Sequence, residues 1–216
     1  MKTKHRATAT LTYVPFAEAP LYWECPVCGN LSGALVMADA NTPCPRCGTA
    51  GVERRSFPNE RLGHLDERIR KYHAESEWEI VVILGATFLE TLLEDMLDRI
   101  MGAHGADVAV RSMVLDNVRA VGQRIGRLFP QLTGEEFEAA ALEMGFRDFP
   151  KRWRRIREVR NAFIHDTQYR EEIEALDAAT ALRTMELMDQ AYSLFVSMNN
   201  KFVADGQRVR GAVQRP

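Results

Sequence analysis

The sequence of 216 residues has no apolar stretch that is long enough to cross a membrane. Its longest apolar run, IVVILGATFL at residues 80–89, is about half the length of a membrane-spanning helix. The basic opening segment, MKTKHRATATLTYVPF, is not followed by the apolar core of a signal peptide. These absences predict a cytoplasmic protein that does not act with a membrane.

The chain also lacks a large net charge, because 28 basic residues face 30 acidic ones and the balance at pH 7 is −2. A protein with this balance does not attract nucleic acid as a whole, so any nucleic-acid partner must be held by local basic patches. Hydrophobic residues make up 46% of the chain, which is enough for a folded core.

Cysteine is scarce, and all four cysteines lie within residues 1–57. Residues 58–204 are instead rich in Ala, Leu, Glu, Arg and Met, with apolar positions three and four apart and no strand pattern. The sequence predicts an all-α helical bundle preceded by a small zinc-ribbon module. We place the ribbon and its flanking segments at 1–57, the bundle at 58–204, and a basic, disordered tail at 205–216.

The spacing of apolar residues predicts six helices in the bundle. Pro130 is expected to stop the third helix, and Pro150 to open the fifth at a position where proline is tolerated. The expected helices cover 59–73, 75–101, 107–128, 133–145, 151–164 and 171–203.

The four cysteines form two matched pairs, CPVCG at 25–29 and CPRCG at 44–48. Two Cys-x-x-Cys pairs at this separation are typical of a tetrahedral zinc site. Four thiolates leave no open coordination position, so we expect one structural Zn²⁺ per chain. The predicted ligands are Cys25, Cys28, Cys44 and Cys47.

Similar knuckles hold iron in rubredoxins, which rubrerythrin-like proteins join to a helical bundle. Such bundles hold two irons through paired Glu-x-x-His motifs. No histidine of this chain has a glutamate three residues before it, which excludes the di-iron interpretation. The histidines are His5, His64, His73, His104 and His165.

The use of the ribbon is open from the sequence. Arginines and aromatic residues around the knuckles are able to contact nucleic acid, or they are solvated charges and local packing. These residues are Tyr22, Trp23, Arg46, Arg54 and Arg55.

The basic helix KRWRRIREVRNAFI at 151–164 has an unusual apolar face. On a helical wheel, Arg160 falls inside this face, where a guanidinium is costly unless a carboxylate or an anion meets it. The residues expected on the core face are Trp153, Ile156, Val159, Phe163 and Ile164.

Asn161 and His165 are four positions apart and share the edge of that face. Arg160 and His165 are separated by about 140° on an ideal helix, so they do not converge within one chain. Two copies facing each other across a two-fold axis would form a composite cleft, which predicts a homodimer. In the structural alternative, His165 caps the end of its helix and Arg160 pairs with a core carboxylate.

The stretch REVRNAFIHD at 157–166 resembles the R-N-x₃-H form of the R-x₄₋₆-H motif of HEPN domains. This resemblance covers about 59–204 and includes the long helix with FLETLLEDML at 88–97. HEPN domains are all-helical, dimerise, and often act as metal-independent RNA endonucleases. The resemblance implies such an endoribonuclease in a prokaryotic toxin or phage-defence system, with an antitoxin or defence protein as partner.

The resemblance also implies roles for single residues. His165 acts as general acid or base near neutral pH, Arg160 stabilises the charge of the phosphorane, and Asn161 orients the histidine or the phosphate. Glu90 and Glu94 are candidate acidic helpers, or part of a solvated face. The basic residues expected to steer the RNA backbone are Lys151, Arg152, Arg154, Arg155 and Arg157.

Two other functions compete with the nuclease. A non-catalytic dimeric adaptor would use the ribbon to bind protein or nucleic acid. A DNA-binding regulator would use the ribbon and the basic helix, but the slightly negative net charge disfavours it.

Overall fold

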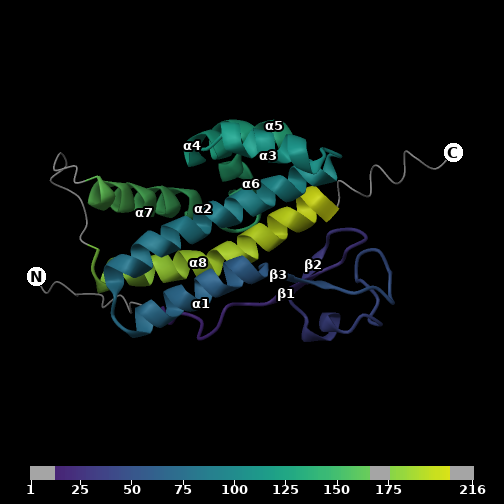
Figure 1. Ribbon diagram of the computed structural model, residues 1–216, viewed down its shortest axis with the longest axis horizontal. Helices are drawn as coiled ribbons and strands as arrows, with labels where there is room; N and C mark the ends of the chain where they lie inside the picture. The colour runs from purple at the N-terminus through teal and green to yellow at the C-terminus, as the bar shows by residue number, and fades with distance from the viewer. Residues whose placement is uncertain (1–12, 166–175, 205–216) are drawn as a thin grey trace, which may run out of the picture.

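The structure is a computed structural model that describes residues 13–165 and 176–204. A small three-stranded antiparallel sheet precedes a helical bundle, which confirms the predicted fold class (Figure 1). The predicted tail at 205–216 and residues 171–175 of the predicted last helix lie outside the described residues.

The sheet has the order β2-β1-β3, with β1 in the centre. The strands are β1 (Tyr22–Glu24), β2 (Leu31–Ser32) and β3 (Arg55–Phe57), and a short 3₁₀ helix η1 (Leu35–Ala38) follows β2. Trp23 of β1 lies opposite Ser32 on one side and Ser56 on the other. The sheet therefore pairs β1, which precedes the first cysteine pair at 25–29, with β3, which follows the second pair at 44–48.

Three long helices form the centre of the bundle: α1 (Glu60–Ala74), α2 (Trp78–Ala103) and α8 (Ala178–Asn199). Asn59 begins α1 by accepting a hydrogen bond from the Leu62 N–H at 3.0 Å. The wide apolar face of α2 packs against α8 and α1, which confirms the two predicted helices at 59–73 and 75–101. None of the helices in the described ranges is long and apolar enough to cross a membrane.

Helices α2 and α8 approach closely at Gly85. A Cβ at this position would collide with Cγ2 of Thr184 on α8. A methyl group at this position would require the Thr184 side chain or one of the two helices to shift.

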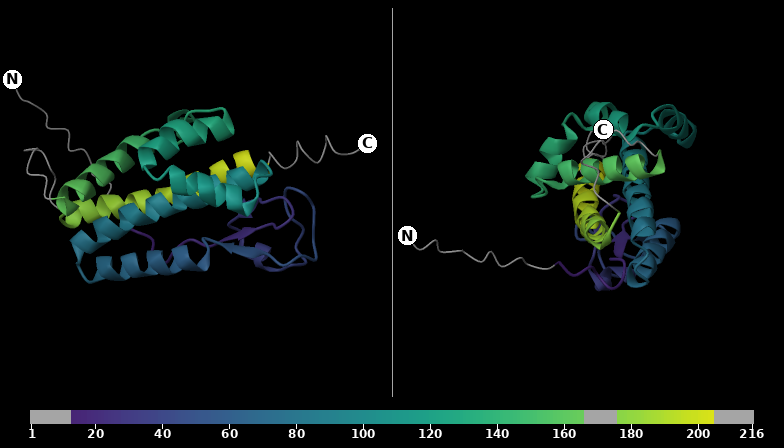
Figure 2. Two further views of the ribbon diagram at one scale, coloured as in Figure 1. Left: turned by 45° about the horizontal axis from the view of Figure 1, so that its top comes forward. Right: turned by 90° about the vertical axis from the view of Figure 1, so that its left-hand side faces the viewer.

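The remaining helices lie on one side of α2 and α8, whereas α1 and the sheet lie on the other (Figure 1; Figure 2). Helix α7 packs against both α2 and α8. The elements of this layer are α3 (Val108–Asn117), α4 (Val121–Gln123), the π-helical turn η2 (Arg124–Leu128), α5 (Phe129–Thr133), α6 (Phe137–Glu143) and α7 (Phe149–Ile164).

The predicted continuous helix at 107–128 is wrong. The chain leaves the helical path after Asn117, where the Arg124 guanidinium caps α3 by donating to the carbonyls of Val118 at 2.7 Å and Leu115 at 3.1 Å. The next helical segment runs through Pro130, because this proline lies in the first turn of α5 and the wider turn η2 precedes it. The break depends on a side chain that folds back onto α3, which periodicity alone does not encode.

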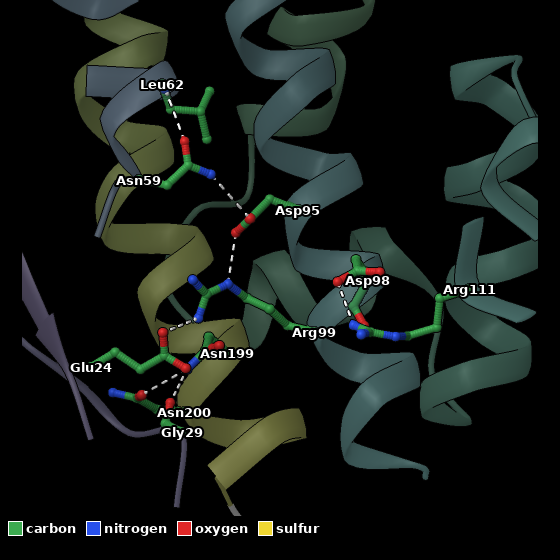
Figure 3. A network of polar contacts seen from close by, with 10 residues as sticks. All are labelled: Glu24, Gly29, Asn59, Leu62, Asp95, Asp98, Arg99, Arg111, Asn199 and Asn200. Carbon is green, nitrogen blue, oxygen red and sulfur yellow. Dashed lines mark hydrogen bonds and ion pairs between the residues drawn. The ribbon is translucent and has the colours of Figure 1, made fainter. Parts of the chain in front are cut away.

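The ribbon is docked on the far end of α8 and on the π-helical turn η3 (Asn200–Ala204) that follows it (Figure 3). Asn200 accepts from the Leu31 N–H at 2.7 Å and donates to the Leu31 carbonyl at 2.8 Å, so one side chain replaces a neighbouring strand at the edge of β2. Asn199 donates to the Gly29 carbonyl at 2.8 Å. Leu31 and Phe57 belong to the same hydrophobic core as α2 and α8.

An ion pair strengthens this docking. Arg99 on α2 lies 3.0 Å from Glu24 on β1 and 2.7 Å from Asp95 one turn earlier (Figure 3). Its guanidinium also covers the Phe57 ring at 5.1 Å. Contacts from both α2 and α8 thus fix the ribbon on the bundle.

A second polar network, the acidic cluster, is buried between α1 and α8 and consists of Asp66, Arg70 and Asp189. Arg70 lies 2.9 Å from Asp66 and 2.7 Å from Asp189. Tyr13 and the Phe16 N–H, at 3.0 Å, also donate to Asp189, so the cluster fastens the N-terminal segment to the bundle.

Candidate functional site

The four cysteines converge as the sequence predicts. Their sulfur atoms all lie within 4.8 Å of one another. The two knuckles match: the Gly29 N–H donates to the Cys25 carbonyl at 2.8 Å, and the Gly48 N–H donates to the Cys44 carbonyl at 2.9 Å. Both glycines have positive φ angles of 69° and 74°, which the tight turn requires.

The geometry of the cluster fits a metal ion. Sγ of Cys25 is 3.7 Å from Sγ of Cys47, and Sγ of Cys28 is 3.8 Å from Sγ of Cys44. A tetrahedral zinc ion with Zn–S bonds of about 2.3 Å separates its sulfur ligands by about 3.8 Å. Burial raises the pKa of the Cys28 thiol, so a nearby cation is needed to hold it as a thiolate.

The residues around the knuckles divide between structural and exposed positions. Arg54 is only 6% exposed and donates to the carbonyls of Thr42 at 2.9 Å and Thr49 at 3.1 Å, so it braces the second knuckle. Tyr22 stacks on Tyr192 of α8. Arg55 is exposed on β3, whereas Trp23 and Arg46 are half-buried.

Helix α7 carries the R-N-x₃-H motif, and its apolar face is only partly buried. Trp153, Ile156 and Val159 are in the core as predicted. The expected burial of Phe163 and Ile164 is wrong, because these side chains are 49% and 50% exposed. Two large apolar side chains within the motif therefore lie on the surface at the last turn of α7.

Arg160 reaches back to α2, where its Nη2 donates to Oε1 of Glu90. Nε of Arg157, one turn earlier, lies 3.6 Å from the same carboxylate oxygen. We call Glu90, Arg157 and Arg160 the basic cluster, since two guanidiniums share one carboxylate. The cluster fixes the position of Arg160, and it joins the predicted arginine to one of the two candidate acidic helpers.

Asn161 and His165 are both exposed at the end of α7. His165 follows the last helical residue, and its N–H donates to the Asn161 carbonyl at 3.0 Å. Its imidazole therefore lies at the surface, as do the side chains of Phe163 and Ile164 in the same turn. Arg160 points to α2 instead, so one chain does not bring the predicted arginine and histidine into a single enclosed site.

The other predicted RNA-binding residues are distributed around α7. Arg152 lies 2.5 Å from Glu186 of α8, Arg154 lies 3.6 Å from Glu138 of α6, and Arg155 lies 3.9 Å from Glu158. Lys151 is exposed. The basic side chains thus have acidic neighbours on several sides and do not form one continuous basic surface within a protomer.

Glu94, the other candidate acidic helper, has a structural contact. Its Oε2 lies 2.7 Å from Nη1 of Arg124, the residue that caps α3. The structure brings Glu90, and not Glu94, to Arg160.

Two features are missed by the sequence analysis. One is the acidic cluster, whose members are far apart in the sequence and carry no motif. The other is a small pocket beside α7 that Gly122 and Gly126 line from the opposite side. These glycines are four positions apart on a short helical segment. This spacing is the one sequence signal of a helix face without side chains, which leaves room for a pocket.

Comparison of the chain with protein-family models, with curated proteins and with solved structures finds no match.

Proposed function

We propose that the protein is a metal-independent RNA endonuclease that acts as a homodimer. The observation that carries this proposal is the end of α7, where Glu90 fixes Arg160 while Asn161 and His165 remain exposed one turn away. A cation held in place and an accessible imidazole, brought together from two copies, are the minimum equipment for cleavage of a phosphodiester by its own 2′-hydroxyl.

The exposed Phe163 and Ile164 support the dimeric part of the proposal. Two large apolar side chains exposed in the last turn of α7, which His165 follows, favour burial against another surface. A second copy docked there across a two-fold axis would place two histidines and two arginines around one cleft. This arrangement overcomes the angular separation of Arg160 and His165 within a single helix.

The chemistry needs one base, one acid and a positive charge. His165 of one copy removes the proton from the 2′-hydroxyl, whose oxygen attacks the neighbouring phosphorus. The 5′-oxygen leaves with a proton from the second histidine, which gives a 2′,3′-cyclic phosphate and a 5′-hydroxyl end. Arg160 stabilises the phosphorane charge and Asn161 orients the phosphate or the imidazole. DNA lacks the attacking hydroxyl and is spared.

The zinc ribbon has a structural role in this proposal, because four thiolates close the coordination sphere. The resemblance to HEPN domains supports the nuclease, and it alone implies a toxin or phage-defence setting with a protein partner. The exposed basic residues of α7 attract the RNA backbone.

The test is cleavage of structured and single-stranded RNA in EDTA by the wild type, Arg160→Ala and His165→Ala. His64→Ala is the matched control, since His64 is an exposed histidine on α1. The EDTA exposure is kept short and the fold is checked by circular dichroism, so that the ribbon retains its metal. We expect cleavage with cyclic phosphate ends by the wild type and the control only. Equal cleavage by all four proteins would refute the proposal.

A non-catalytic adaptor is the second candidate. It is favoured by the Glu90–Arg160 ion pair, which already satisfies the arginine without a substrate, and by the exposed Phe163 and Ile164. An adaptor would retain its partner after Arg160→Ala and His165→Ala but lose it after Phe163→Ser. A nuclease would lose its RNA cleavage after Arg160→Ala and after His165→Ala.

A further inference from the structure

A pocket of about 160 Å³ lies between α7 and the α4–η2 segment, separate from the exposed end of α7. One wall is formed by Gly122, Ile125 and Gly126, and the other by Trp153, Arg154 and Arg157. Glu138 and Pro150 complete the lining. We call it the Trp153 pocket. An engineered cavity of about 150 Å³ holds a benzene molecule, so this pocket has room for a group of five or six heavy atoms.

Two hydrogen-bond donors at this pocket have no acceptor. Trp153 is 1% exposed, and its Nε1 has no hydrogen-bond partner within the described part of the chain. Nε of Arg157 is buried and also lacks a hydrogen bond there, because the nearest Glu90 oxygen is 3.6 Å away. Buried donors without acceptors are rare in folded proteins and are satisfied when a ligand supplies oxygens.

The charge around the Trp153 pocket favours an anion. Glu138 lines the pocket and lies 3.6 Å from Arg154, while Arg157 and Arg160 share the single carboxylate of Glu90, so these five side chains carry one positive charge in excess. Burial lowers the pKa of Arg157, and Arg160 and Arg154 lower it further, whereas Glu90 and Glu158 oppose this effect. The guanidinium is thus under-compensated, and a bound anion would stabilise its charged form.

The glycine wall keeps the pocket open. A Cβ added at Gly122 or Gly126 would meet no atom within 4 Å, so both positions face open space. The two residues are four positions apart and lie on the same side of the helical segment. Larger side chains at these positions would narrow the entrance without any clash in the fold.

We propose that the Trp153 pocket binds a phosphate group, carried by a free nucleotide or by the end of an RNA strand. The Trp153 Nε1–H and the Arg157 guanidinium donate to its oxygens, and Arg154 lies at the rim. A phosphate offers more acceptors and more charge than a carboxylate of similar size, which suits several donors around one small space. This site does not require that Arg160 and His165 cleave RNA.

Isothermal titration of the full-length, zinc-loaded protein with inorganic phosphate and with adenosine monophosphate tests the proposal. We expect saturable binding at one site per chain. Arg157→Gln and Trp153→Phe should each weaken it about tenfold or more, because each removes a donor to a charged oxygen. Trp153→Phe keeps an aromatic ring in the core. Arg68→Gln removes an exposed arginine of α1 and is the matched control, with unchanged affinity.

Gly122→Leu provides a second test that leaves every charged group in place. It should abolish binding while the far-ultraviolet circular dichroism spectrum stays the same, because the added side chain enters open space. Absence of saturable binding to all phosphate probes would overturn the proposal. Binding that survives both Arg157→Gln and Gly122→Leu would overturn it as well.

A comparison of oligoribonucleotides with 5′-phosphate and 5′-hydroxyl ends distinguishes the two sources of the phosphate. A preference of tenfold or more for the phosphorylated end, lost in Gly122→Leu, supports an RNA terminus as the ligand. Binding of adenosine monophosphate with no preference between the two oligonucleotides supports a free nucleotide.

Discussion

The acidic cluster and the basic cluster use the same chemical groups in opposite proportions. In the acidic cluster, the two carboxylates of Asp66 and Asp189 surround the single guanidinium of Arg70. In the basic cluster, the two guanidiniums of Arg157 and Arg160 surround the single carboxylate of Glu90. Each cluster has an excess of one charge. The two clusters differ in whether neighbouring groups of the protein form hydrogen bonds with the charged atoms in excess.

The acidic cluster satisfies its excess internally. Tyr192 donates to Asp66 at 2.5 Å, and the Phe16 N–H donates to Asp189 at 3.0 Å. Burial and the charge of Asp66 raise the pKa of Tyr192, which keeps its hydroxyl protonated as a donor. These two bonds end on the Oδ2 atoms, and the Oδ1 atoms lie 2.9 Å and 2.7 Å from Arg70. The Asp66 Oδ1–Arg70 Nε contact is an ion pair without the geometry of a hydrogen bond, but it is closer than the 3.6 Å between Arg157 and Glu90. Short contacts to every carboxylate oxygen are the pattern of a structural network.

The basic cluster leaves its excess unsatisfied. Nε atoms of Arg157 and Arg160 are buried without hydrogen bonds in the described ranges. Charged groups in excess that find hydrogen-bond partners within the protein stabilise the fold. Charged groups in excess that lack such partners, near a pocket and an exposed histidine, indicate a binding site for a ligand.

The largest expected effect comes from breaking the acidic cluster. Arg70→Met leaves two buried carboxylates without their cation and should lower the free energy of unfolding by about 3–5 kcal/mol. Urea denaturation followed by circular dichroism measures this loss. A cost below about 1 kcal/mol would show that the cluster is not a closed structural network.

A pH dependence should follow from the same cluster. Burial raises the pKa of Asp189 to about 6, although the Phe16 N–H opposes this shift. The folded protein therefore keeps this proton to higher pH than the unfolded chain. Its contribution to stability is present at pH 5 and is lost as the pH rises through about 6, by about 1 kcal/mol between pH 5 and pH 7.

Asp189→Asn provides the matched comparison for this pH effect. The variant should lack that part of the pH dependence, while the metal site and the other carboxylates contribute equally to both proteins. Denaturation of the two proteins at pH 5, 6 and 7 gives the difference directly. Identical slopes would contradict the raised pKa.

A smaller effect on stability is expected from Glu90→Gln, about 0.5–1 kcal/mol, because the basic cluster is partly exposed. The same change should have opposite effects on RNA cleavage and on phosphate binding. RNA cleavage should fall, since Arg160 loses the contact that fixes it, whereas phosphate affinity should rise several-fold because the positive excess grows. Parallel cleavage and titration measurements separate the two responses, and a fall in both would argue against a distinct phosphate pocket.

The smallest effect is expected from Arg157→Met, within about 0.5 kcal/mol of the wild type. Replacing an under-compensated guanidinium by an apolar side chain of similar length removes a desolvation cost along with an ion pair. A loss as large as that of Arg70→Met, in the same urea experiment, would remove the contrast between the two clusters.

The sequence predicts those parts of the molecule that depend on local spacing. The two knuckles, the helices α1 and α2, and the buried residues of the first turns of α7 all follow from short-range patterns. Arg160 was correctly identified as a cation in need of a partner, but its partner Glu90 lies 70 positions away and was only one of two candidates.

The remaining features depend on contacts between distant segments. Arg124 breaks the predicted third helix because its guanidinium reaches α3 and Glu94. Phe163 and Ile164 have core-like spacing but are exposed, because spacing along one helix does not specify which other elements cover its last turn. The acidic cluster joins Tyr13, α1 and α8, and no local pattern specifies such a meeting.

The two hydrogen bonds between the Asn200 side chain and the Leu31 backbone, here called the Asn200 bracket, have a consequence for the metal site. A metal ion that binds only the folded ribbon adds its binding free energy to every contact that needs the folded ribbon, including this bracket and the Glu24–Arg99 ion pair. Metal occupancy and the integrity of the helical bundle are therefore thermodynamically linked. A chelator or an oxidant of the thiols would loosen the end of α8, although no residue of that helix belongs to the four-sulfur cluster.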